Sequence, residues 1–131
     1  SPEKLASAKR IACEFPLLAT GNWTDGVPRA EVKTLTPPLK LEFAAINTDE
    51  GTAQMLGGYG AFDIIARNAA GTLHFLQMYH GAPLYMTTVF AKEGHPGKLK
   101  AAHSRHEAME VALPGYTSSP EQYYGECEIT E

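Results

Sequence analysis

The sequence lacks any run of lysine and arginine, and this absence argues against a nucleic-acid-binding surface. Its 11 basic residues are outnumbered by 15 acidic ones, which gives a formal net charge of −4. Proteins that bind DNA or RNA neutralise phosphates with clustered Lys and Arg, whereas the basic residues here lie among acidic ones. We therefore expect no nucleic-acid partner.

Long apolar runs are also missing. No stretch approaches the roughly 20 apolar residues of a membrane-spanning helix, so we expect no membrane span. The opening residues, SPEKLASAKR, lack the apolar segment of a secretory signal, so we expect that any export signal has been removed. A chain of 131 residues has the length of one domain, and we expect residues 1–131 to form a single domain with one core.

Cysteine is scarce, with two residues near opposite ends of the chain, Cys13 and Cys127. They are either separate buried thiols, which pack as small apolar side chains, or one disulfide between the first and last elements. Strand alternation favours the disulfide, because it places Cys13 on one face with Phe15 and Cys127 on one face with Tyr123. A disulfide implies an oxidising compartment, so we expect an exported protein, periplasmic or secreted.

Turn-forming residues, in contrast, are abundant and break the chain regularly. They occur in TDG (24–26), TPP (36–38), NTDEG (47–51), GGYG (57–60), NAAG (68–71), HGAP (80–83) and EGHPG (93–97). The segments between them have the length and composition of strands, and short connections predict sequential antiparallel hairpins. Residues 39–46 alternate most clearly, and we expect Leu39, Leu41, Phe43 and Ala45 to face the core.

One later segment has helical character. Ser104 and Glu107 fit a capping box, and good helix formers follow, so the sequence predicts a helix at about 105–112. His103 and His106 would then lie at a strand-to-helix junction and form neither a metal clamp nor a catalytic pair. The predicted fold is all-β: an antiparallel up-and-down meander of about eight or nine strands that forms a barrel or flattened sandwich, with one short helix before the last strand.

Two resemblances accompany this prediction. GNW at 21–23 is similar to the Gly-x-Trp that begins the first strand of lipocalin-like barrels, although Asp25-Gly26 turns the chain directly after Trp23. The alternative interpretation is a turn whose Trp closes one end of the core. The segments LHFLQMYHGAPLYMTTVF, KLKAAHSRH and QYYGECE resemble a group of small exported, uncharacterised proteins of alphaproteobacteria. This second resemblance implies export and the cysteine pairing, and it carries no activity.

Signatures of catalysis and metal binding are weak. The histidine spacing does not bring together the three or four ligands that zinc needs, so we expect no metal site and no cofactor. The weak catalytic candidates are His103 and Asp63. An inward Asp63 would have a raised pKa and act as a base beside His103; an outward Asp63, which we favour, would neighbour Arg67. Arg105 is expected either to be solvated or to stack on Trp23.

The central strands carry apolar residues on both faces, so one face forms the core and the other meets the helix, a second subunit or a ligand. We expect a small exported β-barrel binding module that holds a small apolar or amphipathic molecule at its mouth or on a strand face. The predicted lining comprises Phe43, Phe75, Tyr79, Tyr85, Met86 and Phe90, with His103 or Tyr124 as the polar contact. The alternatives are an interaction or structural module acting as a homodimer, and an enzyme that uses His103 with a carboxylate, which the sequence favours less.

Overall fold

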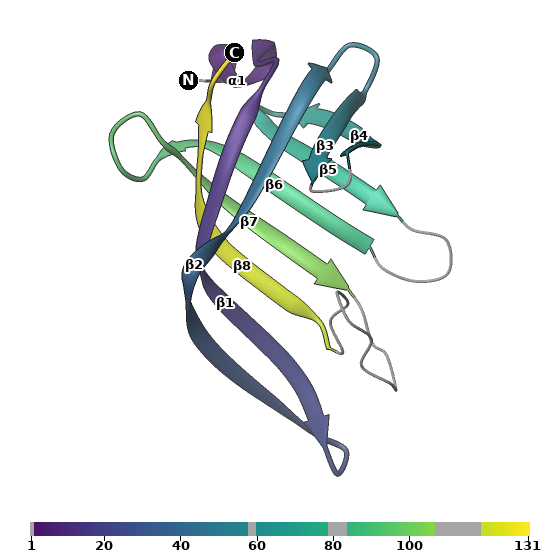
Figure 1. The fold of residues 1–131 in the computed structure, drawn as a ribbon, viewed down its shortest axis with the longest axis vertical. Helices are drawn as coiled ribbons and strands as arrows, with labels where there is room; N and C mark the ends of the chain where they lie inside the picture. Colours follow the sequence, from purple (N-terminus) through teal and green to yellow (C-terminus); the bar gives the residue numbers. More distant parts are fainter. Residues whose placement is uncertain (1, 58–59, 79–83, 107–118) are drawn as a thin grey trace.

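The computed structural model describes residues 2–57, 60–78, 84–106 and 119–131 (Figure 1). A short helix, α1 (Pro2–Ser7), precedes eight strands: β1 (Ile11–Thr24), β2 (Val27–Asn47), β3 (Thr52–Gly57), β4 (Gly60–Ala69), β5 (Thr72–Met78), β6 (Leu84–Glu93), β7 (Leu99–His106) and β8 (Glu121–Ile129). Each strand pairs antiparallel with the next, and β8 pairs with β1, so the sheet closes into a ring. The all-β, antiparallel meander predicted from the sequence is confirmed.

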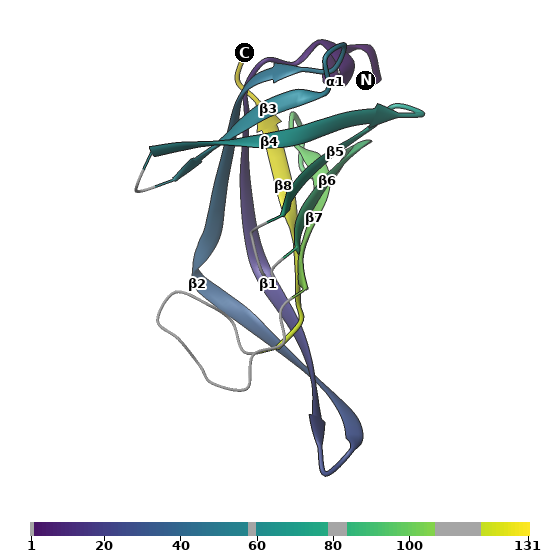
Figure 2. The ribbon, with the colours of Figure 1, turned by 90° about the vertical axis from the view of Figure 1, so that its right-hand side faces the viewer.

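The ring is uneven because β1 and β2 continue beyond it as a two-stranded ribbon (Figures 1 and 2). β1 pairs with β8 only as far as Thr20, whereas its pairing with β2 continues to the turn at Asp25 and Gly26. The predicted turn directly after Trp23 is therefore confirmed. Trp23 itself lies in the ribbon and is 60% exposed, so the interpretation that it closes one end of the core is wrong.

The TPP segment is not a turn. It lies inside the continuous strand β2, at a point where the pairing with β1 slips. Phe15 pairs with Leu39 but Leu17 pairs with Thr34, so residues 35–38 lie opposite the single residue between them on β1. The proline pair therefore marks an irregularity within a strand. This is one of the few sheet positions that accept residues without a backbone N–H.

A second irregularity in β2 changes which residues face the core. Phe43 is buried as expected, and Leu39 and Leu41 pack partly buried against the core. Ala45, however, has a φ of +50° and is exposed, while Ile46 is buried in its place. The pairing with β3 shifts at the same point. The expectation that Ala45 faces inward is wrong, because this bulge reverses the alternation.

The predicted helix at 105–112 is wrong where the structure describes it. Ser104, Arg105 and His106 all lie in β7, so no capping box begins there; residues 107–112 lie outside the described residues. His103 is buried and His106 exposed, so the two side chains occupy opposite faces of a continuous strand and not a strand-to-helix junction. The helix that the structure shows, α1, was not predicted.

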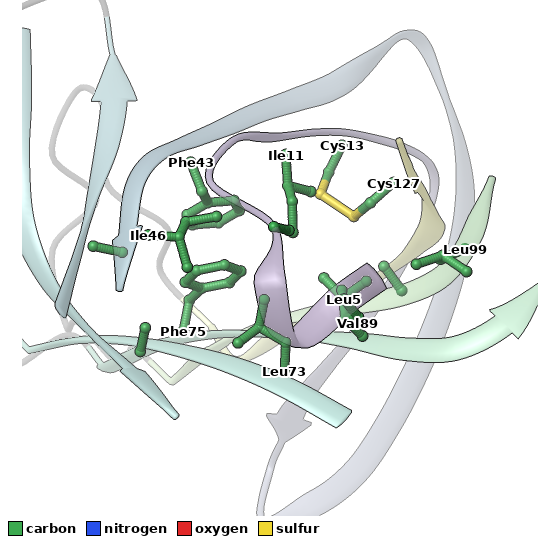
Figure 3. Packing of buried hydrophobic residues seen from close by; sticks show 14 of the residues in the cluster. Leu5, Ile11, Cys13, Phe43, Ile46, Leu73, Phe75, Val89, Leu99 and Cys127 are labelled. Carbon is green, nitrogen blue, oxygen red and sulfur yellow. A yellow bond between two sulfur atoms is a disulfide. The ribbon is translucent and has the colours of Figure 1, made fainter. Parts of the chain in front are cut away.

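The core lies at the α1 end of the ring, where Leu5 of the helix is fully buried (Figure 3). The disulfide prediction is confirmed: Cys13 and Cys127 lie directly opposite each other on β1 and β8, and their sulfurs are bonded. Further along the core the rings of Phe43 and Phe75 stack face to face, with centres 4.0 Å apart. These buried side chains form one hydrophobic cluster inside the ring.

Candidate functional site

The inner face of β5 to β8 is organised in rows that cross the strands, because directly opposed residues on paired strands share a face. The row nearest α1 is apolar and contains Leu73, Val89, Ala101 and Gly125. The middle row contains Phe75, Thr87, His103 and Tyr123. The last row, which we call the mouth row, contains Gln77, Tyr85, Arg105 and Glu121. The inner face thus changes from apolar to polar with distance from α1.

The mouth row lies at the end of the ring opposite α1. Its residues belong to the last part of β5 and β7 and the first part of β6 and β8, which gather at that end in Figure 1. The strands that carry them are held in register by the pairing of β5 with β6, β6 with β7 and β7 with β8. A rigid sheet therefore positions the polar side chains.

His103 occupies the middle row and is 1% exposed. Its Nδ1 lies 2.7 Å from Thr87 Oγ1, and Arg105 Nε donates a hydrogen bond of 3.0 Å to its Nε2. A guanidinium can only donate, so the imidazole is neutral, and its Nδ1–H donates to the threonine hydroxyl. Burial, and after it the positive charge of Arg105, lowers the pKa of His103 from 6.5 to about 3.

Arg105 is half-buried beneath two aromatic rings of the inner face. Its Cζ lies 4.8 Å from the ring centre of Tyr85 and 5.3 Å from that of Tyr123. These contacts replace the predicted alternative of stacking on Trp23. Arg105 forms no ion pair with any carboxylate that the structure describes. Glu121, its cross-strand neighbour, instead accepts a hydrogen bond of 2.7 Å from the Tyr123 hydroxyl.

Gln77 begins the mouth row and is 8% exposed. Its Oε1 accepts no hydrogen bond from any residue in the described part of the chain. It lines a cavity of about 10 Å³ together with Tyr85, Thr87 and His103. A space of this size holds about one water molecule, so this cavity beneath the mouth row does not accommodate a larger ligand without movement of its walls.

The structure brings some of the predicted lining residues together and separates others. Four of them face inward: Phe43, Phe75, Tyr85 and His103. Of these, Phe43 and Phe75 are fully buried and stack on each other, so they belong to the core. Three point outward: Met86, Phe90 and Tyr124. Tyr79 lies outside the described residues.

Five members of the two polar rows were not among the predicted site residues: Gln77, Thr87, Arg105, Glu121 and Tyr123. Alternation carried enough information for two of them. Tyr123 is four residues from Cys127 on β8 and therefore lies on the same inner face, whereas Tyr124 points outward. Thr87 likewise shares a face with the inward Tyr85. For Gln77, Arg105 and Glu121, alternation predicts a face but no partners.

The catalytic pair considered for Asp63 and His103 does not form. Asp63 is exposed on β4, where its Oδ1 accepts a hydrogen bond of 3.4 Å from Gln54 Nε2. Asp63 therefore points outward, as favoured, but its partner is Gln54, since Arg67 donates to the backbone carbonyls of Gly51 and Ala66 instead. Both ring nitrogens of His103 are engaged by Thr87 and Arg105, neither of which is a carboxylate. The arrangement around His103 is suited to holding the arginine in place.

The outer face carries an apolar row of its own. Ile65, Leu76 and Met86 lie directly opposite one another across β4, β5 and β6, and the nearby Met78 is strongly exposed. This row is the part of the surface on which the homodimer hypothesis depends.

Within residues 2–57, 60–78, 84–106 and 119–131, no three His, Cys, Asp or Glu side chains are grouped to hold a metal ion. The helix in these ranges has neither the length nor the apolar composition to cross a membrane.

Comparisons with known proteins give no family assignment: no protein-family model, curated protein or solved structure matches this chain. The resemblances to exported alphaproteobacterial proteins and to lipocalin-like barrels stay hypotheses. The function is therefore argued from the two polar rows.

Proposed function

We propose that this protein binds a small amphipathic molecule at the mouth row of its barrel. The observation that carries the proposal is the state of Arg105. A half-buried guanidinium is fixed by two tyrosine rings and a neutral histidine, and no described carboxylate pairs with it. Holding a cation partly out of water costs free energy unless a polar partner compensates for it, and a bound molecule supplies such a partner.

The packing of the interior favours the mouth over the centre of the barrel as the binding position. The Phe43–Phe75 stack fills the interior next to the middle row, and the cavity beside it has room for about one water molecule. A ligand that lies across the mouth row avoids displacing this core. It still contacts the rings of Tyr85 and Tyr123.

The opposite wall of the mouth supplies the apolar half of the proposed site. Met55 and Ile64 line the same small cavity as Gln77. Phe62 lies directly opposite Met55 across β3 and β4 and is 38% exposed. A polar row facing a partly exposed apolar wall is the arrangement that an amphipathic molecule requires.

We also propose that the protein acts in an oxidising compartment, as an exported protein. The Cys13–Cys127 disulfide supports this, because such bonds persist outside the reducing cytosol. Export brings the binding site into contact with molecules of the surrounding medium.

The experiment that tests the binding proposal is a titration followed by NMR with labelled tyrosines, of which the chain has six. Octyl compounds with anionic, cationic and neutral head groups serve as probes. We expect saturable shifts of the Tyr85 and Tyr123 resonances with at least one of them. Tyr124, which neighbours Tyr123 in sequence but points outward and is 46% exposed, is the internal control.

Matched variants sharpen this test. Tyr85→Ala should weaken binding, because its ring contacts Arg105 at the mouth, whereas Tyr124→Ala should leave binding unchanged. The absence of saturable binding for every head group would contradict the proposal, as would shifts confined to the outer face. Light scattering over a wide concentration range tests the homodimer alternative. A dimer that the outer-face substitution Met86→Lys dissociates would favour that alternative.

A further inference from the structure

We infer that the molecule bound at the mouth row carries a carboxylate and that this group binds the terminal nitrogens of Arg105. The inference rests on the function proposed above and names the chemical class of the ligand's polar end.

Arg105 has N–H donors that no residue in the described ranges accepts from. An arginine has five N–H donors. The Nε–H donates to His103 Nε2, which fixes that edge of the guanidinium against the middle row. The terminal nitrogens Nη1 and Nη2 make no hydrogen bond or ion pair with any residue in the described ranges. Two parallel N–H donors held in this way match the two oxygens of a carboxylate.

The side chains around Arg105 are already ordered by contacts within the protein. Tyr85 of the mouth row and Tyr123 of the middle row lie on β6 and β8, the two strands that flank β7, and both rings contact Arg105 at about 5 Å. His103, which orients the Nε edge, is itself held by Thr87. A ligand therefore meets a guanidinium whose conformational entropy has largely been lost on folding, and this reduces the cost of binding.

The charges around Arg105 favour a monoanionic ligand. Arg105 is the only cationic side chain in the two polar rows of β5 to β8, since burial keeps His103 neutral. Glu121 lies across the strand from Arg105 and adds one negative charge. A phosphate that carries close to two negative charges would meet one cation and one repelling carboxylate. A carboxylate carries one negative charge, which the single positive charge of Arg105 balances.

The side chains next to Arg105 favour an apolar body on the ligand. The rings of Tyr85 and Tyr123 flank the guanidinium, and the partly exposed Phe62 lies beside Met55 on the facing wall. An aliphatic or aromatic group attached to the carboxylate would contact these side chains and bury apolar surface. The class of ligand is therefore a small carboxylic acid with an apolar body.

The experiment compares head groups on a constant tail. Octanoate, octyltrimethylammonium and octanol, each below its aggregation concentration, are titrated into the full chain with its disulfide intact, and inorganic phosphate is added as a fourth probe. Binding is followed by calorimetry and by the Tyr85 and Tyr123 resonances. We expect octanoate to bind about tenfold or more tightly than the other octyl compounds, which is the size of one charge-assisted contact.

The variants assign that preference to individual residues. Arg105→Gln should remove the preference for octanoate, while Lys100→Gln, the same loss of charge at an exposed position of β7, should keep it. Glu121→Gln should tighten octanoate binding, because it removes the neighbouring negative charge. Circular dichroism and the thermal midpoint of each variant establish that it is folded. If Arg105→Gln does not fold, Arg105→Lys retains the charge but loses the bidentate edge and should bind octanoate several-fold more weakly.

The outcomes separate this inference from the proposed function. Equal binding of all three octyl compounds at the mouth would overturn the inference and leave the binding function standing. A preference for octanoate that survives Arg105→Gln would overturn it too, as would phosphate binding as tight as that of octanoate. No binding of any compound would overturn the proposed function itself.

Discussion

The buried neutral imidazole of His103 makes the stability of this protein depend on pH in a way that one substitution should remove. In the folded protein the pKa of His103 is lowered to about 3, from an ordinary value of 6.5. Below pH 6.5 the unfolded chain binds a proton at this side chain and the folded protein does not. Stability is therefore greatest above pH 6.5 and falls as the pH decreases toward 3.

The size of the effect follows from the two pKa values. One proton taken up on unfolding changes the free energy of unfolding by about 1.4 kcal/mol per pH unit. Between about pH 8 and pH 4.5 the loss attributable to His103 is about 2–3 kcal/mol, which is large against a typical total of about 5–15 kcal/mol. Carboxylates contribute mainly below this range. One of them is Glu126, whose pKa is lowered chiefly by a hydrogen bond from the backbone N–H of His95.

The assay is urea denaturation of the wild-type protein and the variant His103→Gln across this pH range. Glutamine accepts a hydrogen bond from Arg105 but binds no proton, so its curve should be flatter by about 1.4 kcal/mol per pH unit between about pH 6 and pH 5. His106→Gln, an exposed position on the same strand, should keep the wild-type slope. Parallel curves for the wild-type protein and His103→Gln would refute the reasoning, because they would mean that His103 titrates alike in both states.

Two further predictions concern the closure of the ring by β1 and β8. Replacing Cys13 and Cys127 by serine opens a loop with a sequence separation of 114. The double substitution should lower the free energy of unfolding by about 4–5 kcal/mol in the chain-entropy treatment. An unchanged denaturation midpoint would count against this prediction. Gly125→Ala should destabilise the fold strongly, because a Cβ there meets the backbone carbonyl of Glu14, whereas Gly21→Ala in the ribbon has room and should be tolerated. Thermal midpoints of the two glycine variants check this, and equal values would contradict it.

Strand alternation predicted the part of this fold that depends only on which face a residue occupies. The two-residue repeat of side-chain direction along a strand predicted that Cys13 and Cys127 face inward, and the disulfide confirms that assignment. It failed at Ala45, where a bulge inserts an extra residue and reverses the pattern. A bulge leaves no reliable mark in the sequence, because an alanine at positive φ is selected by the surrounding pairing and not by its own preference.

Local propensity was a poorer guide where a neighbouring strand determines the conformation. Ser104 and Glu107 satisfy the pattern of a capping box, yet residues up to His106 pair with β6. Arg105 gains a full set of cross-strand contacts from this pairing, and such contacts outweigh helix preferences of a few tenths of a kcal/mol per residue. Likewise, Pro37 and Pro38 of β2 predict a turn because their lack of a backbone N–H is visible in the sequence, whereas the slipped pairing that accommodates them is not.

The candidate site depends on a level of structure that alternation does not reach, namely the register between strands. Tyr85 and Arg105 face inward in any register that preserves the faces, and a shift of two residues between β6 and β7 preserves them all. Such a shift would leave every prediction of a face intact and yet move Arg105 from Tyr85 to a position opposite Thr87. The guanidinium would then lose one of the two rings that hold it. The proposed binding site therefore depends on the register of β5 to β8, which the closed ring fixes. The residue types alone do not determine which side chains contact Arg105.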